Sequence, residues 1–61
     1  MRNDGIEILS ETESFSVWRM KEPDGETTYH LELGTVTVHF FREEWEEMVE
    51  LMREATRAAE G

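Results

Sequence analysis

The sequence predicts an α+β fold in which a four-stranded antiparallel β-meander is followed by one C-terminal α-helix. Two periodicities lead to this prediction: apolar residues recur at every second position between 15 and 40, and at every third or fourth position after 42. Hairpin turn signals at Pro23-Asp24-Gly25 and Gly34-Thr35 separate the alternating segments. We therefore expect a single domain over residues 1–61, with residues 1–5 and 60–61 frayed.

The strands are expected at residues 6–9, 15–21, 27–33 and 36–40. The first is short, with Ile6 and Ile8 on one side, and the polar residues 10–14 connect it to the second. Pro-Asp-Gly favours a three-residue hairpin loop that ends in a glycine bulge and pairs Glu22 with Glu26. Glycine as the first residue of Gly34-Thr35 favours a two-residue turn between the last two strands.

These two turns determine which side chains share a face of the sheet, because the side-chain period of a strand is two. One face forms a core and carries Phe15, Val17, Tyr29, Leu31, Leu33, Val36, Val38 and Phe40. The opposite face carries Ser16, Trp18, Met20, Thr28, His30, Glu32, Thr37 and His39. There Trp18 lies opposite His30, and His30 opposite His39. Such a patch is either a stacking platform for bases or a docking surface for another protein chain, unless a one-residue slip moves Trp18 into the core.

A helix is predicted from about Arg42 to Ala59, directly after the strand that ends in "VHFF". At about 100° per residue its apolar stripe covers roughly half of the circumference, which is more than one small sheet needs. We expect the surplus to bind a second copy of the chain. The dimer interface is expected at Trp45, Met48, Leu51, Met52 and Ala55. The alternative is a monomer whose helix is more apolar than its sheet requires.

The chain is strongly acidic, with 15 Asp and Glu against 6 Lys and Arg and a net charge of −9. Lys21 is the one lysine among the basic residues. A salt-rich cytoplasm favours such a surface, because salt screens its self-repulsion, so we expect a halophilic archaeal source. The alternative is an ordinary acidic protein whose glutamates lie on one solvated helix face. The apolar runs are too short for a membrane span, and we expect a cytoplasmic protein.

No residue set in the sequence predicts catalysis. The chain has no cysteine, and its serines near the second strand have no histidine in register to activate them. The glutamates of the helix have no enclosed pocket that could raise a pKa, and the glycines are too separated to form a phosphate-binding loop. His30, His39 and Glu32 are only a weak match to a metal site. We therefore expect no enzyme, no metal and no cofactor.

The segment "GTVTVHFFREEWEEMVELM", residues 34–52, resembles the last strand and the helix of the DNA-binding domain of positive cofactor four, a transcriptional coactivator. In this resemblance Gly34 begins the last strand, Trp45 is the early-helix tryptophan, and Met48 with Leu51 or Met52 holds packing positions. The family's strands are rich in lysine and arginine, which are scarce here. The resemblance implies a dimer formed through the helices, with single-stranded or melted DNA bound across the sheets.

We therefore predict a small homodimeric, transcription-associated protein that binds single-stranded DNA or RNA. Arg19 and Lys21, together with Arg42, are expected to meet phosphates, and aromatic rings to stack on unpaired bases. The expected nucleic-acid interface is Trp18, Arg19, Lys21, His30 and His39. The alternative is an acidic protein–protein interaction module, either an adaptor or an inhibitor that mimics nucleic acid. It would oppose a basic partner with the row Glu43, Glu46, Glu47, Glu50 and Glu54.

Overall fold

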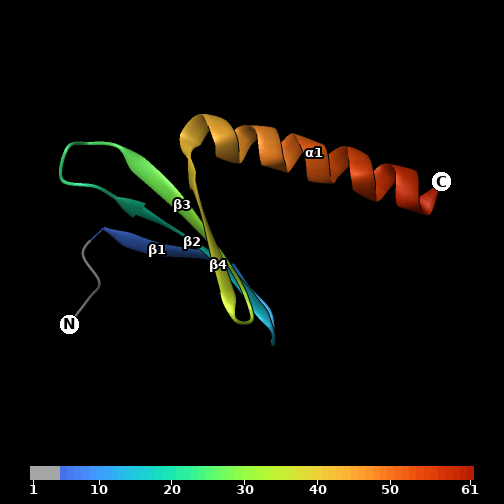
Figure 1. The fold of residues 1–61 in the computed structure, drawn as a ribbon, viewed down its shortest axis with the longest axis horizontal. Helices are drawn as coiled ribbons and strands as arrows, with labels where there is room; N and C mark the ends of the chain where they lie inside the picture. The colour runs from blue at the N-terminus through green and yellow to red at the C-terminus, as the bar shows by residue number, and fades with distance from the viewer. Residues whose placement is uncertain (1–4) are drawn as a thin grey trace.

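A computed structural model describes residues 5–61 as one antiparallel sheet followed by one helix (Figure 1). The elements are β1 (Ile6–Glu11), β2 (Phe15–Lys21), β3 (Thr27–Leu33), β4 (Val36–Phe41) and α1 (Arg42–Glu60). The strands neighbour one another in chain order, so the sheet is a meander. The α+β fold predicted from the sequence, four antiparallel strands and a C-terminal helix, is therefore confirmed.

Both predicted hairpin turns are present. Gly25 and Gly34 have φ angles of +94° and +73°, the left-handed region that glycine adopts without a Cβ clash. In the first turn the Glu22 N–H donates to the Glu26 carbonyl at 2.7 Å, which is the expected pairing. The Asp24 carboxylate accepts from the Glu26 N–H at 3.0 Å, as aspartate does in turns.

The strand register is the predicted one, and it separates the side chains onto two faces. Leu33 pairs with Val36, and Trp18 pairs with His30, which in turn pairs with His39. The face that carries Tyr29 is covered in part by α1, and we call it the helix-side face. The opposite face, here the open face, carries Ile6, Ile8, Ser16, Trp18, Met20, Thr28, His30, Glu32, Thr37, His39 and Phe41.

Strand β1 is longer than the sequence predicts. Its pairing with β2 continues past Leu9 to Glu11 through an irregularity between Ile8 and Ser10. The side chains there are polar, but ladder hydrogen bonds join backbone groups, and a polar edge strand can still pair. Ile6 and Ile8 point to one side as predicted, opposite Met20 and Trp18.

Backbone hydrogen bonds join both ends of the described chain to the fold. Residues 1–4, part of the expected frayed start, lie outside the described residues. The Gly5 carbonyl accepts from the Lys21 N–H at 2.9 Å. At the other end Glu60 is the last helical residue, and the Gly61 N–H donates to the Arg57 carbonyl at 3.0 Å.

No loop separates β4 from α1. Phe41 has an extended backbone, with φ −82° and ψ 170°, and the next residue is helical. The carboxylate of Glu44 accepts from the Phe41 N–H at 3.1 Å. This is half of a capping box, because a phenylalanine side chain cannot accept the reciprocal bond. Because no loop intervenes, the end of β4 determines where the helix begins.

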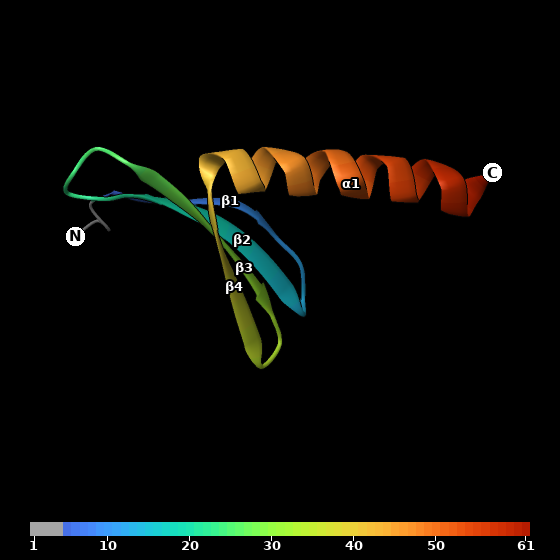
Figure 2. The ribbon, with the colours of Figure 1, turned by 45° about the horizontal axis from the view of Figure 1, so that its top comes forward.

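One tryptophan holds the helix on the sheet. The Trp45 ring stacks on Tyr29 with centroids 4.7 Å apart and planes 5° apart, and meets Phe40 edge-on at 6.1 Å. Among the described strands, only β3 and β4 come within 8 Å (Cα–Cα) of the helix. Residues 50–60 are all exposed. The C-terminal half of α1 therefore projects beyond the sheet (Figures 1 and 2).

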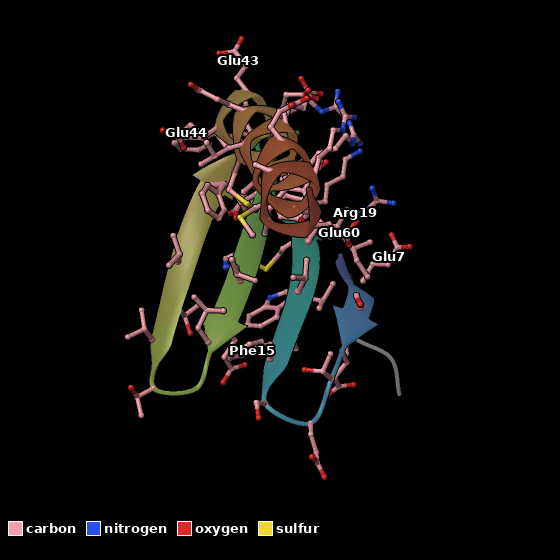
Figure 3. All side chains as sticks on the ribbon, turned by 90° about the vertical axis from the view of Figure 1, so that its right-hand side faces the viewer. Glu7, Phe15, Arg19, Glu43, Glu44 and Glu60 are labelled. Carbon is pink, nitrogen blue, oxygen red and sulfur yellow. The ribbon has the colours of Figure 1, made fainter. Side chains whose placement is uncertain are left out.

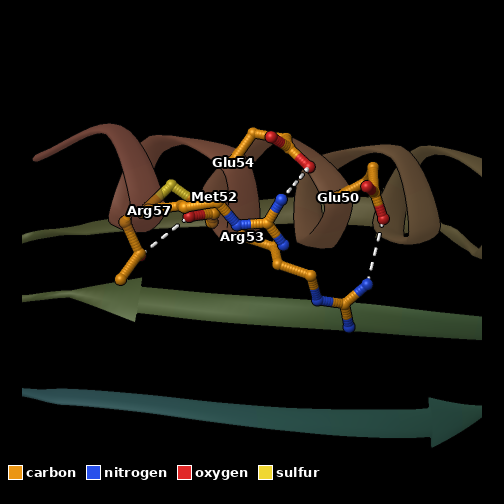
Figure 4. Close-up of polar contacts among 6 residues, drawn as sticks. Glu50, Met52, Arg53, Glu54 and Arg57 are labelled. Carbon is orange, nitrogen blue, oxygen red and sulfur yellow. Dashed lines mark hydrogen bonds and ion pairs between the residues drawn. The ribbon is translucent and has the colours of Figure 1, made fainter. Parts of the chain in front are cut away.

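Contacts in the projecting part of the helix are local. Glu50 pairs with Arg53 at 3.0 Å, and Glu54 with Arg57 at 3.6 Å (Figure 4). The Thr56 hydroxyl donates to the Met52 carbonyl of the preceding turn at 2.8 Å. Over the described residues α1 has no stretch apolar enough to cross a bilayer.

The junction gives the first prediction. We expect Glu44→Ala to lower the free energy of unfolding by about 1 kcal/mol more than Glu43→Ala does, because only Glu44 accepts the Phe41 N–H. Both variants remove one carboxylate from the first helical turn, so their effects on the helix dipole match. Urea unfolding at one protein concentration measures the difference, and equal losses would contradict the proposed cap.

Candidate nucleic-acid interface

A recess of about 520 Å³ lies on the helix-side face, at the end of the sheet where β4 enters α1. Its walls are Gly5, Ile6, Glu7, Arg19, Lys21, Thr27, Tyr29 and Arg42. Three of the six basic residues of the chain therefore line one recess. With the Glu7 carboxylate set against these three cations, the recess keeps a net charge of +2, so it is a local positive site on a protein of net charge −9.

Two structural features bring these cations together. Arg19 and Lys21 are two positions apart on β2, so they point to the same face. Arg42 is the first residue of α1, and the loopless junction places it beside them. The sequence suggested this trio as phosphate ligands, and the structure places all three in the lining of the recess.

An acidic neighbour holds Arg19 in place. The Glu7 carboxylate, on the adjacent strand β1, lies 2.8 Å from Arg19 Nη2 and 2.9 Å from Nε (Figure 3). The hydrogen bond to Glu7, followed by one to Tyr29, raises the pKa of Arg19 above its ordinary value. Arg19 is 43% exposed, so this pair mainly orients the guanidinium, and exposed pairs of this kind add little stability.

The open face has a row of stacked rings at its centre. Trp18 and His30 lie parallel, with centroids 5.3 Å apart and planes 2° apart. His39 meets His30 edge-on at 4.5 Å. His30 is only 6% exposed and contacts the Thr28 hydroxyl through Nε2 at 3.1 Å. The parts of this row that a ligand can reach are therefore the outer surface of half-buried Trp18 and the exposed His39.

Beside the ring row the open face is apolar toward the end that holds Ile6 and Phe41 and polar toward the end that holds Ser16, Glu32 and Thr37, and it lacks basic side chains. Ile8 and Phe41 are 60% and 61% exposed, and Ile6 is 40% exposed. No residue of β1–β4 that points to this face is a lysine or an arginine. An exposed apolar patch of this kind is typical of a surface that contacts another molecule.

The structure therefore divides the predicted nucleic-acid interface between two faces. Arg19 and Lys21 lie in the recess on the helix-side face, whereas Trp18, His30 and His39 form the ring row on the open face. Residues adjacent in a strand alternate between faces, so Trp18 and Arg19 cannot point the same way.

Sequence reasoning missed the acidic and the aromatic side chain in the lining of the recess, Glu7 and Tyr29. Tyr29 was assigned to the core, and it is indeed buried there at 5% exposure. The placement of Glu7 opposite Arg19 follows from the pairing of β1 with β2. The one available signal was the position of Glu7 between Ile6 and Ile8, which puts it on the other face from them.

The residues predicted for a dimer interface do not share one environment. Trp45 and Met48 are half-buried, and Trp45 already contacts Tyr29 of its own chain. Leu51 and Met52 are 66% and 53% exposed, and Ala55 is exposed as well. The part of this set that a second chain can cover is therefore the part beyond the sheet.

Metal chemistry has no cluster of ligands to use within the described residues. Over residues 5–61 no group of three or more His, Cys, Asp or Glu side chains is placed to hold an ion.

Comparisons with protein-family models, with curated proteins and with solved structures return no match for this chain.

His30 makes the stability of the sheet depend on pH. Its burial, and next the nearby His39, lower its pKa below the ordinary 6.5, and the carboxylate of Glu22 opposes this only in part. The unfolded chain therefore binds a proton at this position more readily than the folded chain. The stability contribution is complete above about pH 6.5 and is lost as the pH falls through 6.5 toward the lowered folded-state value.

We expect an NMR titration of the folded protein to give His30 a pKa below 6.5. In His39→Gln that pKa should move upward, because one cause of the shift has been removed. Unfolding measured against pH should lose part of its dependence just below pH 6.5 in His30→Gln. A His30 that titrates at or above 6.5 in the folded wild type would contradict this account.

Proposed function

We propose that the protein is a small homodimer that binds single-stranded DNA or RNA and acts in transcription. The observation that carries this proposal is the convergence of Arg19, Lys21 and Arg42 on one recess. In a chain with six basic and fifteen acidic residues, half of the cations gather at one place. The phosphate backbone is the part of a nucleic acid that such a place attracts.

The recess offers the donors that phosphates need. The two guanidinium groups can each present parallel N–H donors to one phosphate, and the Lys21 ammonium adds a compact charge. Helix α1 begins at Arg42, so the positive end of its dipole lies next to the recess. Glu7 offsets one of the three charges, and it keeps Arg19 oriented at the same time.

This mode of binding reads the backbone more than the bases. The aromatic ring nearest the cations, Tyr29, is buried and already stacked on Trp45, so it offers no platform for a base. Trp18 and His39 lie on the other face of the sheet. We therefore propose phosphate-directed binding with little sequence preference, a mode whose affinity falls as the salt concentration rises.

A homodimer would carry two recesses, and engaging both on one strand increases the apparent affinity without new contacts. The exposed Leu51 and Met52 on α1 support this part of the proposal. Three phosphate contacts imply a log–log salt slope of about −2 for a single strand in one recess, and about −4 when one strand engages both recesses. The acidic composition further favours a halophilic archaeal source, because a salt-rich cytoplasm screens the self-repulsion of such a chain.

The proposal is tested by fluorescence anisotropy with a labelled single-stranded oligonucleotide over a series of potassium chloride concentrations. We expect Arg42→Gln to weaken binding by roughly tenfold, because a charge-assisted hydrogen bond is lost, and to reduce the salt slope by about 0.7 for each recess that the strand engages. Arg53→Gln is the matched control, since it removes the same charge from the same helix outside the recess. No wild-type binding at protein concentrations on the order of tens of micromolar would overturn the proposal.

A second candidate function, an acidic protein-interaction module, is favoured by the open face. Ile8 and Phe41 are largely exposed there, and no basic strand residue accompanies them. Such a surface suits a protein partner better than it suits a phosphate backbone. The glutamates of α1 are exposed as well, although Glu50 and Glu54 are paired with arginines one turn away.

Affinity capture from a nuclease-treated lysate of the source organism separates the two functions. If the protein-interaction module is correct, a stoichiometric partner is retained by the wild type and by Arg42→Gln and is lost with Ile8→Glu, which places a charge in the apolar patch. Recovery of nucleic acid without nuclease, dependent on Arg42 and indifferent to Ile8→Glu, supports the recess instead.

A further inference from the structure

The helix-side face of the sheet is uncovered at the end that holds the Gly34-Thr35 turn. Phe15, Leu33 and Val36 are paired side by side across three strands, and they are 51%, 39% and 54% exposed. Figure 3 shows Phe15 at the end of the sheet away from the first turn of the helix, where Glu43 and Glu44 lie. We call this row the bare strip. Next to it along the strands the half-buried Val17, Leu31 and Val38 continue the apolar surface.

The helix shows the opposite feature, an apolar stripe that its own sheet does not cover. Residues 50–60, here the projecting half of α1, are all exposed, whereas Trp45, Met48 and Val49 of the same stripe are half-buried. Leu51 and Met52 are exposed to 66% and 53%. Each chain thus has one apolar sheet surface without a helix and one apolar helix surface without a sheet.

The area that the chain exposes beyond a compact monomer is about the area that one partner buries in a protein–protein interface. The chain exposes 5151 Å², whereas a folded monomer of its mass exposes about 4,100 Å². Its radius of gyration is 13.2 Å, against about 10.5 Å for a compact domain of this length. The excess of roughly 1,000 Å² is close to the ~800 Å² that each partner buries in a standard interface.

We propose that two copies of the chain associate reciprocally, with the projecting half of each helix covering the bare strip of its partner's sheet. The proposal rests on the homodimer of the proposed function and specifies how its subunits meet. A two-fold axis near the middle of the helices would bury both surfaces of both chains at once, because such interfaces are self-complementary. Helix-to-helix pairing alone would leave the bare strip exposed.

Length and charge fit this arrangement. The eleven residues of the projecting half span about 16 Å, and the strands of the partner's sheet on which they would lie span about 20–24 Å. The projecting half carries three acidic and two basic residues, a net −1, whereas residues 42–49 carry four acidic and one basic, a net −3. The bare strip is uncharged, so two strongly acidic chains would meet through their least charged surfaces. The recess lies at the other end of the sheet and stays accessible.

The absence of cysteine from the sequence allows a direct test by cross-linking. An Ala55→Cys chain is mixed with a Val36→Cys chain and treated with a short bis-maleimide, and we expect a covalent heterodimer of about twice 7.2 kDa. Two matched controls should give little product: Glu54→Cys, on the side of the helix opposite Trp45, in place of Ala55→Cys, and Thr37→Cys, on the open face, in place of Val36→Cys. Circular dichroism confirms that each variant is folded.

The outcomes are distinct. Cross-linking between two Met52→Cys chains without any Ala55-to-Val36 product would mean pairing through the helices alone and would overturn the proposal. Light scattering that finds a folded wild-type monomer of 7.2 kDa at micromolar concentration would overturn it too. Loss of the wild-type dimer in Met52→Glu and in Val36→Glu, but not in Thr37→Glu, would support it. Nucleic-acid binding at the recess is measured separately with Arg42→Gln, so its failure is distinguishable from the failure of this arrangement.

Discussion

The stack of Trp45 on Tyr29 is the interaction on which the rest of this structure depends. It is the main link between the helix and the sheet, and with the loopless junction at Phe41 it sets the direction of α1. That direction brings Arg42 beside Arg19 and Lys21. It also carries the second half of the helix past the sheet (Figure 2), so one contact shapes both the recess and the uncovered helix surface.

The most deeply buried side chains among the described residues are rings. Among the described residues only Tyr29 and His30 are buried, and they lie on opposite faces of the sheet: Tyr29 stacks on Trp45, and His30 stacks on Trp18 and meets His39 edge-on. An aromatic pair contributes about 0.5–1.5 kcal/mol beyond its buried area. This is a small core for 61 residues without disulfides, and each leucine or methionine covered by a partner would add about 1.5–3 kcal/mol.

The distribution of charge follows the same division of surfaces. Carboxylates are concentrated on the first half of α1, cations in the recess, and neither sign on the bare strip. Two acidic chains can therefore approach through apolar surfaces while the recess still faces solvent. Salt would favour the assembly by screening the remaining repulsion, whereas it would weaken phosphate binding because fewer counterions are then released.

The sequence by itself determined the elements whose causes are local. Alternation and the turn residues at Gly25 and Gly34 specified the register of β2, β3 and β4, and the change of period specified a helix from Arg42. Only the tertiary structure decided the extension of β1, the meeting of Glu7 with Arg19, and the convergence of three cations. These features depend on strand pairing and on the angle at which Trp45 packs the helix against the sheet, and sequence spacing encodes neither of them. The division of the predicted interface between two faces has a local cause instead, because Trp18 and Arg19 are adjacent in β2 and therefore point to opposite faces.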